Sequence, residues 1–300
     1  MRLVARVPAT VANLGPGFDA LGLAVGLHNE VVADTDAAPS VEVRGEGAGE
    51  LPADASNLVF RAMTYLSREA GRPLHQMALR CTNRIPLERG LGSSAAAVVA
   101  GLLLGDRLLA TGLGADALLE MAIDLEGHAD NVAACLRGGL VVAYLSRLGW
   151  RAEALEPHPA LRPVLLVPSD ERLATQDARR VLPREVPLPD AAFNVARASL
   201  AVLALTERPH LLAEALEDRL HQPRRLPLVP SSRAVFEELR SAGVPVCVAG
   251  SGPSLVGFEV GGAAVPELGP RWRAIRVEVA PGATVEEVAA PAGRPGGEGP

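Results

Sequence analysis

A glycine- and serine-rich segment stands directly before a long apolar run. Residues 86–97 read PLERGLGSSAAA, and alanine, valine and leucine occupy most positions from 93 to 110. This composition predicts a helix that is apolar on all sides and therefore buried. The first amides of a helix lack partners within it, the helix dipole is positive there, and glycine lets an anion approach the backbone. The segment therefore predicts a phosphate site, with a plain glycine turn and serine cap as the alternative.

Two short matches to a dinucleotide-binding fingerprint keep a second activity open. Residues 90–95, GLGSSA, and residues 15–20, GPGFDA, both fit G-x-G-x-x-A. A Rossmann loop follows directly from a strand, whereas a polar stretch with a proline, 84–89, precedes the first match and Pro16 interrupts the second. An NAD-linked oxidoreductase is therefore the weaker interpretation.

The chain contains no lysine, so all 29 basic residues are arginine. A Walker A loop, a protein kinase and a pyridoxal enzyme each need a lysine at the phosphates or at the cofactor. These three classes are excluded, whatever causes the absence of lysine.

Composition indicates a soluble globular protein with two domains, since its 300 residues are 48% hydrophobic and 21% charged. The uncharged stretch at 90–105 is shorter than the roughly 20 apolar residues of a membrane span, and the N-terminus lacks the apolar core of a secretory signal. A net charge of -6 and 3% aromatic residues argue against nucleic-acid binding. Three scattered cysteines predict buried reduced thiols, and we expect a cytoplasmic protein.

Hydrophobic periodicity outlines a mixture of helices and strands. The expected helices are 57–69, 93–110, 116–125, 193–205, 210–220 and 231–242, and the expected strands are 3–7, 41–44, 77–82, 140–144, 164–167, 244–248, 255–260 and 275–279. The periodicity dissolves into charges and prolines between 151 and 163, which predicts a domain boundary. We expect an α+β chain with domains at 1–155 and 156–288 and a disordered tail at 289–300.

Three glycine-bearing segments, taken in order, resemble those of the GHMP kinase superfamily. They are PATVANLGPGFDALG at 8–22, PLERGLGSSA at 86–95 and AGSGPS at 249–254. The second fits the family's P-x-x-x-G-L-G-S-S-A without a mismatch, and this motif serves ATP without a Walker lysine. The pattern is most similar to the homoserine kinase family, through the first segment, EGHADNV at 126–132, TQDAR at 175–179 and QPRR at 222–225. Ala129 and Gln222 replace that family's usual proline and glutamate.

The resemblance implies a two-domain α+β fold, with a left-handed β-α-β unit in the N-terminal domain, a ferredoxin-like C-terminal domain and ATP between them. It also implies a homodimer that transfers the γ-phosphate of ATP to L-homoserine with Mg²⁺, a step towards threonine. The implied ATP contacts are Asn57, Pro86, Arg89, Gly90, Leu91, Gly92, Ser93, Ser94, Ala95 and Ala96. The implied substrate contacts are Asn13, Asp19, Asn131, Thr175, Arg179, Arg225 and Gly252, and the implied catalytic residues are Glu126, Asn131 and Arg179.

The residue types suit these roles. An amino acid substrate needs arginine for its carboxylate and a carboxylate for its ammonium group, which Arg225 and Asp19 can supply. Glu126 is a hard oxygen ligand that could hold Mg²⁺ beside Ser94 and the phosphates. Taken singly, each of these residues is equally typical of a turn or a solvated surface. His128 could be a metal ligand or a base, but a structural loop histidine is the better interpretation.

Asn131 stands where the resemblance to mevalonate kinase and galactokinase would place a catalytic aspartate. An amide cannot accept a proton, so Asn131 is expected to orient the hydroxyl while positioning and charge neutralisation lower the barrier. Asp130 as a base is the competing hypothesis. Two alternative functions remain: another GHMP kinase, acting on mevalonate or a sugar, and a regulator that binds ATP without transferring phosphate.

Overall fold

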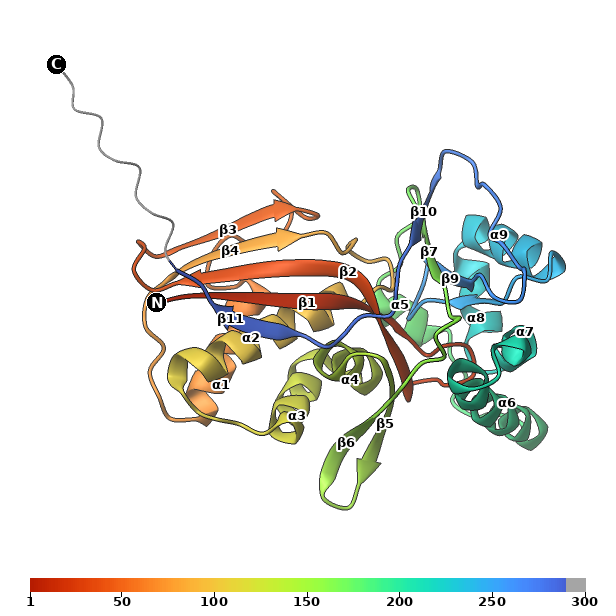
Figure 1. Cartoon of the computed structure of the whole chain (residues 1–300), viewed down its shortest axis with the longest axis horizontal. Coiled ribbons are helices and arrows are strands. Elements are labelled where there is room, and N and C mark those ends of the chain that lie inside the picture. Colours follow the sequence, from red (N-terminus) through yellow and green to blue (C-terminus); the bar gives the residue numbers. More distant parts are fainter. Residues whose placement is uncertain (290–300) are drawn as a thin grey trace.

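Two sheets, each covered by helices, make up the molecule (Figure 1). The computed structural model describes residues 1–289, so the predicted tail lies outside the described residues from 290 onward. The first sheet has seven strands and the second has four. The two-domain α+β fold class is therefore confirmed.

The larger sheet is built mainly from the N-terminal half of the chain. Its strands are β1 (Arg2–Ala12), β2 (Leu21–Asp34), β3 (Ser40–Gly45), β4 (Ala78–Asn83), β5 (Leu140–Ser146), β6 (Gly149–Leu155) and β11 (Thr284–Glu287). The order is β11-β1-β2-β4-β3, while β5 pairs with β2 and with β6. Strands β3 and β4 are parallel and are joined through helix α1 (Leu58–Glu69), which forms the β-α-β unit.

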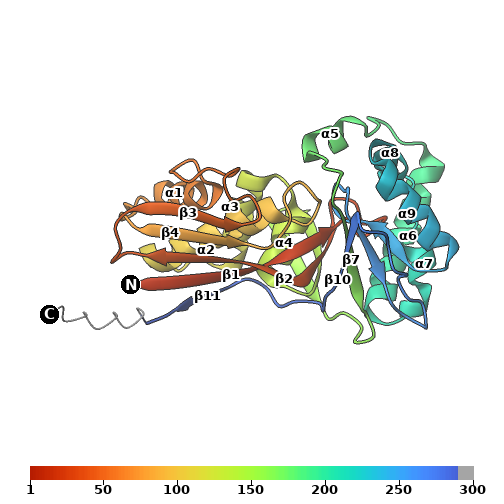
Figure 2. The same ribbon diagram turned by 90° about the horizontal axis from the view of Figure 1, so that it is seen from above.

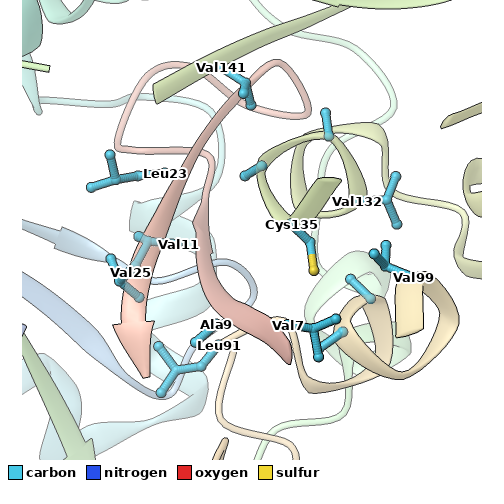
Figure 3. Close-up of a cluster of buried hydrophobic side chains, with 14 of the residues drawn as sticks. Val7, Ala9, Val11, Leu23, Val25, Leu91, Val99, Val132, Cys135 and Val141 are labelled. Atoms are coloured by element: carbon cyan, nitrogen blue, oxygen red, sulfur yellow. The ribbon is translucent and has the colours of Figure 1, made fainter. Parts of the chain in front are cut away.

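Four helices cover one face of this sheet (Figure 1). They are α1, α2 (Ser93–Leu109), α3 (Ala115–Glu126) and α4 (Ala129–Arg137). Alternate residues of β1, Val7, Ala9 and Val11, are fully buried, and Figure 3 shows them together with Val99 of α2 and Cys135 of α4. The predicted helix at 93–110 is α2, and its burial on nearly all sides explains its uniformly apolar sequence. This packing fixes the end of α2 that begins at the glycine segment.

The smaller sheet is antiparallel, with strand order β10-β7-β9-β8. Its strands are β7 (Pro163–Pro168), β8 (Val246–Val248), β9 (Leu255–Phe258) and β10 (Trp272–Arg276). The helices of this half are α5 (Thr175–Arg180), α6 (Leu188–Thr206), α7 (Leu212–Ala215), α8 (Gln222–Arg225) and α9 (Pro230–Ser241), with 3₁₀ turns at Pro209–Leu211 and Leu226–Leu228. Figure 2 shows that this sheet lies between the larger sheet and helices α6 and α9.

Helix α6 is long and apolar enough to cross a membrane by length and composition alone, and 22% of its apolar window is buried. The sequence-based expectation considered only residues 90–105 and overlooked this helix. One face of α6 packs through polar groups, since Asn194 donates to Asp218 and Arg197 to Glu217. A single helix that passes this test by length and composition alone is weak support for a membrane span.

The predicted elements differ from the structure at several places. The expected helix at 210–220 ends at Ala215, because the Asp218 carboxylate accepts hydrogen bonds from the backbone amides of Leu220, His221 and Gln222 and thereby holds a turn. Residues 149–155, placed in a region without periodicity, form β6, the solvent-facing partner of β5 in a hairpin. The last predicted strand, 275–279, is β10 at Trp272–Arg276.

The chain returns to its first sheet after the second one is complete. Val279 forms a bridge to Val25, and β11 pairs antiparallel with β1. The predicted second range, 156–288, therefore includes a strand of the larger sheet. The domain boundary near residue 155, where the chain first leaves the larger sheet, remains a prediction.

Candidate active site

A cavity of about 270 Å³ lies where loops of the larger sheet meet α5, α8 and the turn after β8. Its lining consists of Asn13, Asp19, Pro86, Glu88, Gly90, Leu91, Gly92, Ser93, Ser94, Glu126, His128, Asp130, Asn131, Leu173, Ala174, Thr175, Arg179, Arg225, Gly250 and Ser251. Residues from both halves of the chain thus face one space.

The glycine segment forms one wall of the cavity and leads into α2. Gly92 caps the helix with φ 71°, and no side chain caps the first helical amides. Gly90, with φ 72°, packs so tightly that a Cβ there would lie 2.1 Å from the Ala249 carbonyl oxygen. A helix N-terminus with free amides and positive dipole charge suits a phosphate group.

Glu126 and His128 stand at the junction of α3 and α4. Gly127, with φ 86°, ends α3 and turns the chain, and His128 directs both its backbone amide and Nδ1 at Glu126 Oε2. The hydrogen bond to Glu126 raises the pKa of His128. Arg179 Nε donates to His128 Nε2, so Nδ1 carries the proton in this arrangement. Glu126 Oε1 makes no hydrogen bond to the described residues and can bind a ligand in the cavity.

The lining fits Mg²⁺ bound jointly with a nucleotide. In residues 1–289, no group of three or more histidine, cysteine, aspartate or glutamate side chains could hold a metal ion. Mg²⁺ commonly uses one or two protein ligands together with substrate phosphates and water. Glu126 and the exposed Ser94, both on the cavity wall, are residues of the type that could serve as such ligands.

Asp130 and Asn131 lie in the first turn of α4. Burial, with a further contribution from the charge of Asp19, raises the pKa of Asp130 to about 7. Its Oδ1 accepts a hydrogen bond from the Asn131 backbone amide. The Asn131 side chain is held from behind by Thr10, whose hydroxyl donates to Oδ1 at 2.8 Å.

Arg179 and Asp19 form a two-point ion pair across the cavity. The guanidinium donates to both carboxylate oxygens, at 2.7 Å and 3.1 Å. Asp19 sits in a turn with φ 56°, and the Asn13 side chain bridges this turn to Gly250. A positive φ is uncommon for residues other than glycine and is least costly for asparagine and aspartate. The turn therefore holds a carboxylate beside an arginine at a fixed place.

Arg225 is a buried cation, with 2% of its surface exposed. Its guanidinium donates to the carbonyl oxygens of Gly250 and Ala178 and lies 5.4 Å from the Phe18 ring centroid. Burial, together with the nearby Arg179, lowers its pKa to about 10. No carboxylate among the described residues forms an ion pair with Arg225, although its side chain lines the cavity. The position suits an anionic group of a ligand.

The structure brings most of the sequence-predicted site residues to this cavity. Thirteen of them line it: Asn13, Asp19, Pro86, Gly90, Leu91, Gly92, Ser93, Ser94, Glu126, Asn131, Thr175, Arg179 and Arg225. Five others lie outside its lining: Asn57, Arg89, Ala95, Ala96 and Gly252. The roles of all these residues, inside and outside the lining, stay predictions.

Two of these five side chains have structural partners elsewhere. Asn57 caps α1 by accepting from the Val59 amide, and its amide nitrogen donates to Pro52. Arg89 is buried and donates to the carbonyl oxygens of Pro168 and Ser169, which ties the glycine segment to the end of β7.

Sequence analysis assigned no role to five of the lining residues: Glu88, Leu173, Ala174, Gly250 and Ser251. Leu173 and Ala174 precede Thr175, and Gly250 and Ser251 precede Gly252. Their closeness in the sequence to a predicted site residue is the feature that could have identified them. His128 and Asp130, which were weighed as alternatives, also line the cavity.

Comparisons with known proteins agree with this geometry. The family model described as GHMP kinases N terminal domain matches residues 57–139, and the one described as GHMP kinases C terminal matches residues 200–258. The chain is 45% identical over 294 residues to homoserine kinase of Streptomyces avermitilis, which covers 95% of this chain and 96% of that protein. It is 47% identical over 256 residues to homoserine kinase of Streptomyces coelicolor, covering 84% and 82% respectively.

A solved structure is similar over the whole fold. The crystal structure of homoserine kinase from Cytophaga hutchinsonii aligns with a TM-score of 0.82 and 29% identity, covering 95% of this chain and 97% of that one. The sequence identity to the Streptomyces enzymes, over nearly the full length of both chains in one case, shows family membership. The chain belongs to the homoserine kinase family of the GHMP kinases.

Proposed function

We propose that this enzyme transfers the γ-phosphoryl group of ATP to the hydroxyl group of L-homoserine, giving ADP and O-phospho-L-homoserine on the way to threonine. One observation carries the proposal. The buried guanidinium of Arg225, which pairs with no carboxylate among residues 1–289, shares a cavity of about 270 Å³ with Asp19 and the N-terminus of α2. A small amphoteric acceptor and a phosphate chain find complementary charges there.

The substrate takes its orientation from its two charged groups. The substrate carboxylate binds Arg225 and also contacts Arg179. The ammonium group binds Asp19, which is paired with Arg179 in the structure. Binding therefore replaces part of an existing ion pair with ligand contacts. The hydroxyl end of the acceptor then lies towards Asn131 and the first turn of α2.

The transfer step forms a bond between the hydroxyl oxygen and the γ-phosphorus and breaks the bond to the β,γ-bridging oxygen, so ADP leaves. The transition state is loose, and the nucleophile loses its proton late, to a phosphoryl oxygen or to water. The free amides at Ser93 and Ser94 stabilise the charge on the phosphate oxygens. Glu126 and Ser94 would hold Mg²⁺, and the chemistry that this ion would supply is neutralisation of the phosphate charge.

Asp130 as a general base is the competing mechanism, and a specific observation favours testing it. Burial raises its pKa to about 7, near the range where a base works best. We still assign the step to positioning, because a loose transition state leaves little charge on the attacking hydroxyl until late, so a base has little to contribute. If Asp130→Asn abolished turnover and left both substrates bound, the base mechanism would replace ours.

The proposal is tested by ADP release in a coupled assay with Mg²⁺ and a panel of acceptors. We expect turnover that depends on L-homoserine, with mevalonate and galactose inactive. Equal turnover with mevalonate or a sugar would indicate another GHMP kinase activity. Binding of ATP without turnover on any acceptor would indicate a regulator.

We also propose a cytoplasmic homodimer. Cys81, Cys135 and Cys247 are free and buried, which suits a reducing compartment. For the dimer, α6 presents apolar side chains to solvent, with Leu188 81% and Val195 68% exposed. Exposed apolar groups of this size on one helix are typical of a surface that a partner covers.

A further inference from the structure

We infer that Thr10 is a positioning residue that decides which end of the Asn131 amide faces the acceptor hydroxyl. The inference rests on the proposed function, because it concerns the hydroxyl that receives the phosphoryl group. Thr10 lies near the end of β1, is fully buried, and does not line the cavity. Its effect on a reaction must therefore pass through its neighbours.

Thr10 contacts both sides of the reaction through two separate groups. Its hydroxyl donates to Asn131 Oδ1 at 2.8 Å. Its backbone amide donates to the Leu91 carbonyl oxygen at 3.1 Å, within the glycine segment. One residue of β1 thus contacts both α4 and the glycine segment.

The fit around the hydroxyl is close. A Cβ on Gly92 would lie 2.0 Å from Thr10 Oγ1 and 3.2 Å from Asn131 Oδ1. The absence of a side chain at Gly92 therefore leaves room for the Thr10–Asn131 hydrogen bond directly beneath the phosphate loop.

Two contacts agree on the orientation of the Asn131 amide. Oδ1 accepts from Thr10, and Nδ2 lies 3.5 Å from Asp130 Oδ1, which also accepts from the Asn131 backbone amide and therefore faces Nδ2 as an acceptor. An amide nitrogen has two N–H groups, so one remains for the cavity. Asn131 consequently offers the acceptor hydroxyl a donor, and this donor fixes the direction of the hydroxyl lone pairs.

The decisive variants change the hydroxyl of Thr10 while preserving its shape. Thr10→Val keeps the volume and the backbone amide but leaves Asn131 Oδ1 without its donor. We expect kcat with homoserine to fall roughly tenfold, with little change in the KM for ATP. Thr10→Ser retains the hydroxyl and should restore most of the rate. Equal kcat for Thr10→Val and the parent would overturn the inference.

A second set separates positioning from a general loss of structure. In an Asn131→Ala background, Thr10→Val should cause no further fall in kcat, because the group that it positions is gone. A full additional tenfold fall would show that Thr10 acts elsewhere. If Thr10→Val does not fold, Thr10→Ala in the same two backgrounds gives the same comparison. Thr64→Val is the matched control, because the Thr64 hydroxyl donates only within α1, to Phe60.

Asn131→Asp tests the direction of the amide. Its carboxylate can still accept from Thr10 but has no N–H to offer the substrate, so we expect kcat to fall as far as in Asn131→Ala. Activity close to the parent would show that Asn131 does not act as a donor and would overturn the inference.

The parent enzyme is assayed first with homoserine: failure there counts against the proposed function, whereas failure of Thr10→Val alone to change kcat counts only against the role of Thr10.

Discussion

Arg225 offers the sharpest test of substrate recognition at the scale of a single residue. Its guanidinium is buried, donates to two carbonyl oxygens and pairs with no carboxylate in the described part of the chain. Arg225→Lys replaces a planar fork by a point charge, so the two-point grip on the substrate carboxylate is lost. The loss of a charge-assisted hydrogen bond costs about 1.5 to 3 kcal/mol. We expect kcat/KM for homoserine to fall roughly ten- to a hundredfold, and further in Arg225→Ala.

The neighbouring exposed Arg224 provides the control for Arg225. Arg224→Lys should leave kcat/KM for homoserine unchanged, and ATP affinity measured without homoserine should be similar in both variants. Weakened ATP binding with a normal homoserine dependence in Arg225→Lys would instead assign Arg225 to the phosphates.

Glu126 makes a separate prediction about Mg²⁺. One carboxylate oxygen is held by His128, and the other has no hydrogen-bond partner among residues 1–289. Glu126→Gln should lower kcat and raise the Mg²⁺ concentration needed for half-maximal rate, because a carboxylate ligand is lost. Glu120→Gln, on the surface of the same helix, serves as the control. A parent-like Mg²⁺ titration of Glu126→Gln would leave Glu126 with a structural role only.

Asp130 should leave a signature in the pH dependence of stability. Burial raises its pKa from 3.8 to about 7, so the folded state holds this proton at pH values where the unfolded chain has lost it. The free energy of unfolding therefore decreases as pH rises between these values. In Asp130→Asn this pH-dependent loss of stability is absent. The Tm of Asp130→Asn minus the Tm of the parent should therefore increase from pH 4 to pH 8. A Tm difference that is independent of pH would contradict the buried, protonated carboxyl group.

Among the elements, the start of α2 depends on Gly92. Its φ of 71° disfavours any side chain, and a Cβ would collide with Thr10 Oγ1. Gly92→Ala should weaken ATP binding and also lower kcat, because the added methyl group displaces both the phosphate loop and the Thr10–Asn131 pair. Isothermal titration with ATP and the coupled assay measure the two effects.

Gly112 supplies a matched control for the backbone strain alone. Its φ is 64°, and nothing lies within 4 Å of the position that a Cβ would take. Gly112→Ala should therefore lower the Tm slightly and leave kcat and ATP affinity unchanged. Equal kinetic effects in both variants would mean that strain, and not the collision at the phosphate loop, explains the Gly92 result.

Elements with a strong local pattern were predictable from the sequence, and those defined by distant partners were not. Helix α2 follows from its apolar composition, but the turn after Ala215 depends on the Asp218 side chain, whose influence on backbone amides no periodicity shows. Strand β6 is defined by its pairing with β5 while its side chains remain largely at the surface, so its charges concealed it. Strand β2, with 14 residues, was missed because glycine, histidine and asparagine interrupt its alternation.

The residues of the candidate site divide in the same way, into those predictable from a local motif and those defined by distant partners. Contiguous motifs placed most of its residues, because the predicted phosphate and acceptor contacts lie on loops that are continuous in the sequence. The burial of Arg225 and the ion pair of Arg179 with Asp19 could not be predicted, since 160 positions separate the two members of the pair. The role of Thr10 was equally hidden: a threonine within a strand shows nothing of the amide 121 positions away.

For the whole molecule, the exposed apolar face of α6 predicts where two copies meet. Val195→Glu places a charge on this face and should convert the proposed dimer into a monomer, as measured by light scattering after size exclusion. Leu148, 80% exposed at the tip of the β5–β6 hairpin, is an equally apolar position outside α6. Leu148→Glu should leave the dimer intact. A monomeric parent, or dissociation by Leu148→Glu alone, would reject α6 as the interface.

The pairing of β11 with β1 also determines the order in which the molecule can be completed. Leu3 lies opposite Glu287, so one edge of the first sheet stays open until almost the entire described chain has been synthesised (Figure 2). Until then, β1 presents unpaired amide and carbonyl groups along that edge, which is a template for pairing between chains. During synthesis the sheet of the N-terminal half therefore has one unpaired edge strand, and β11 covers this edge only once it has been made. Such long-range closure slows folding and extends the time during which nascent chains can associate wrongly.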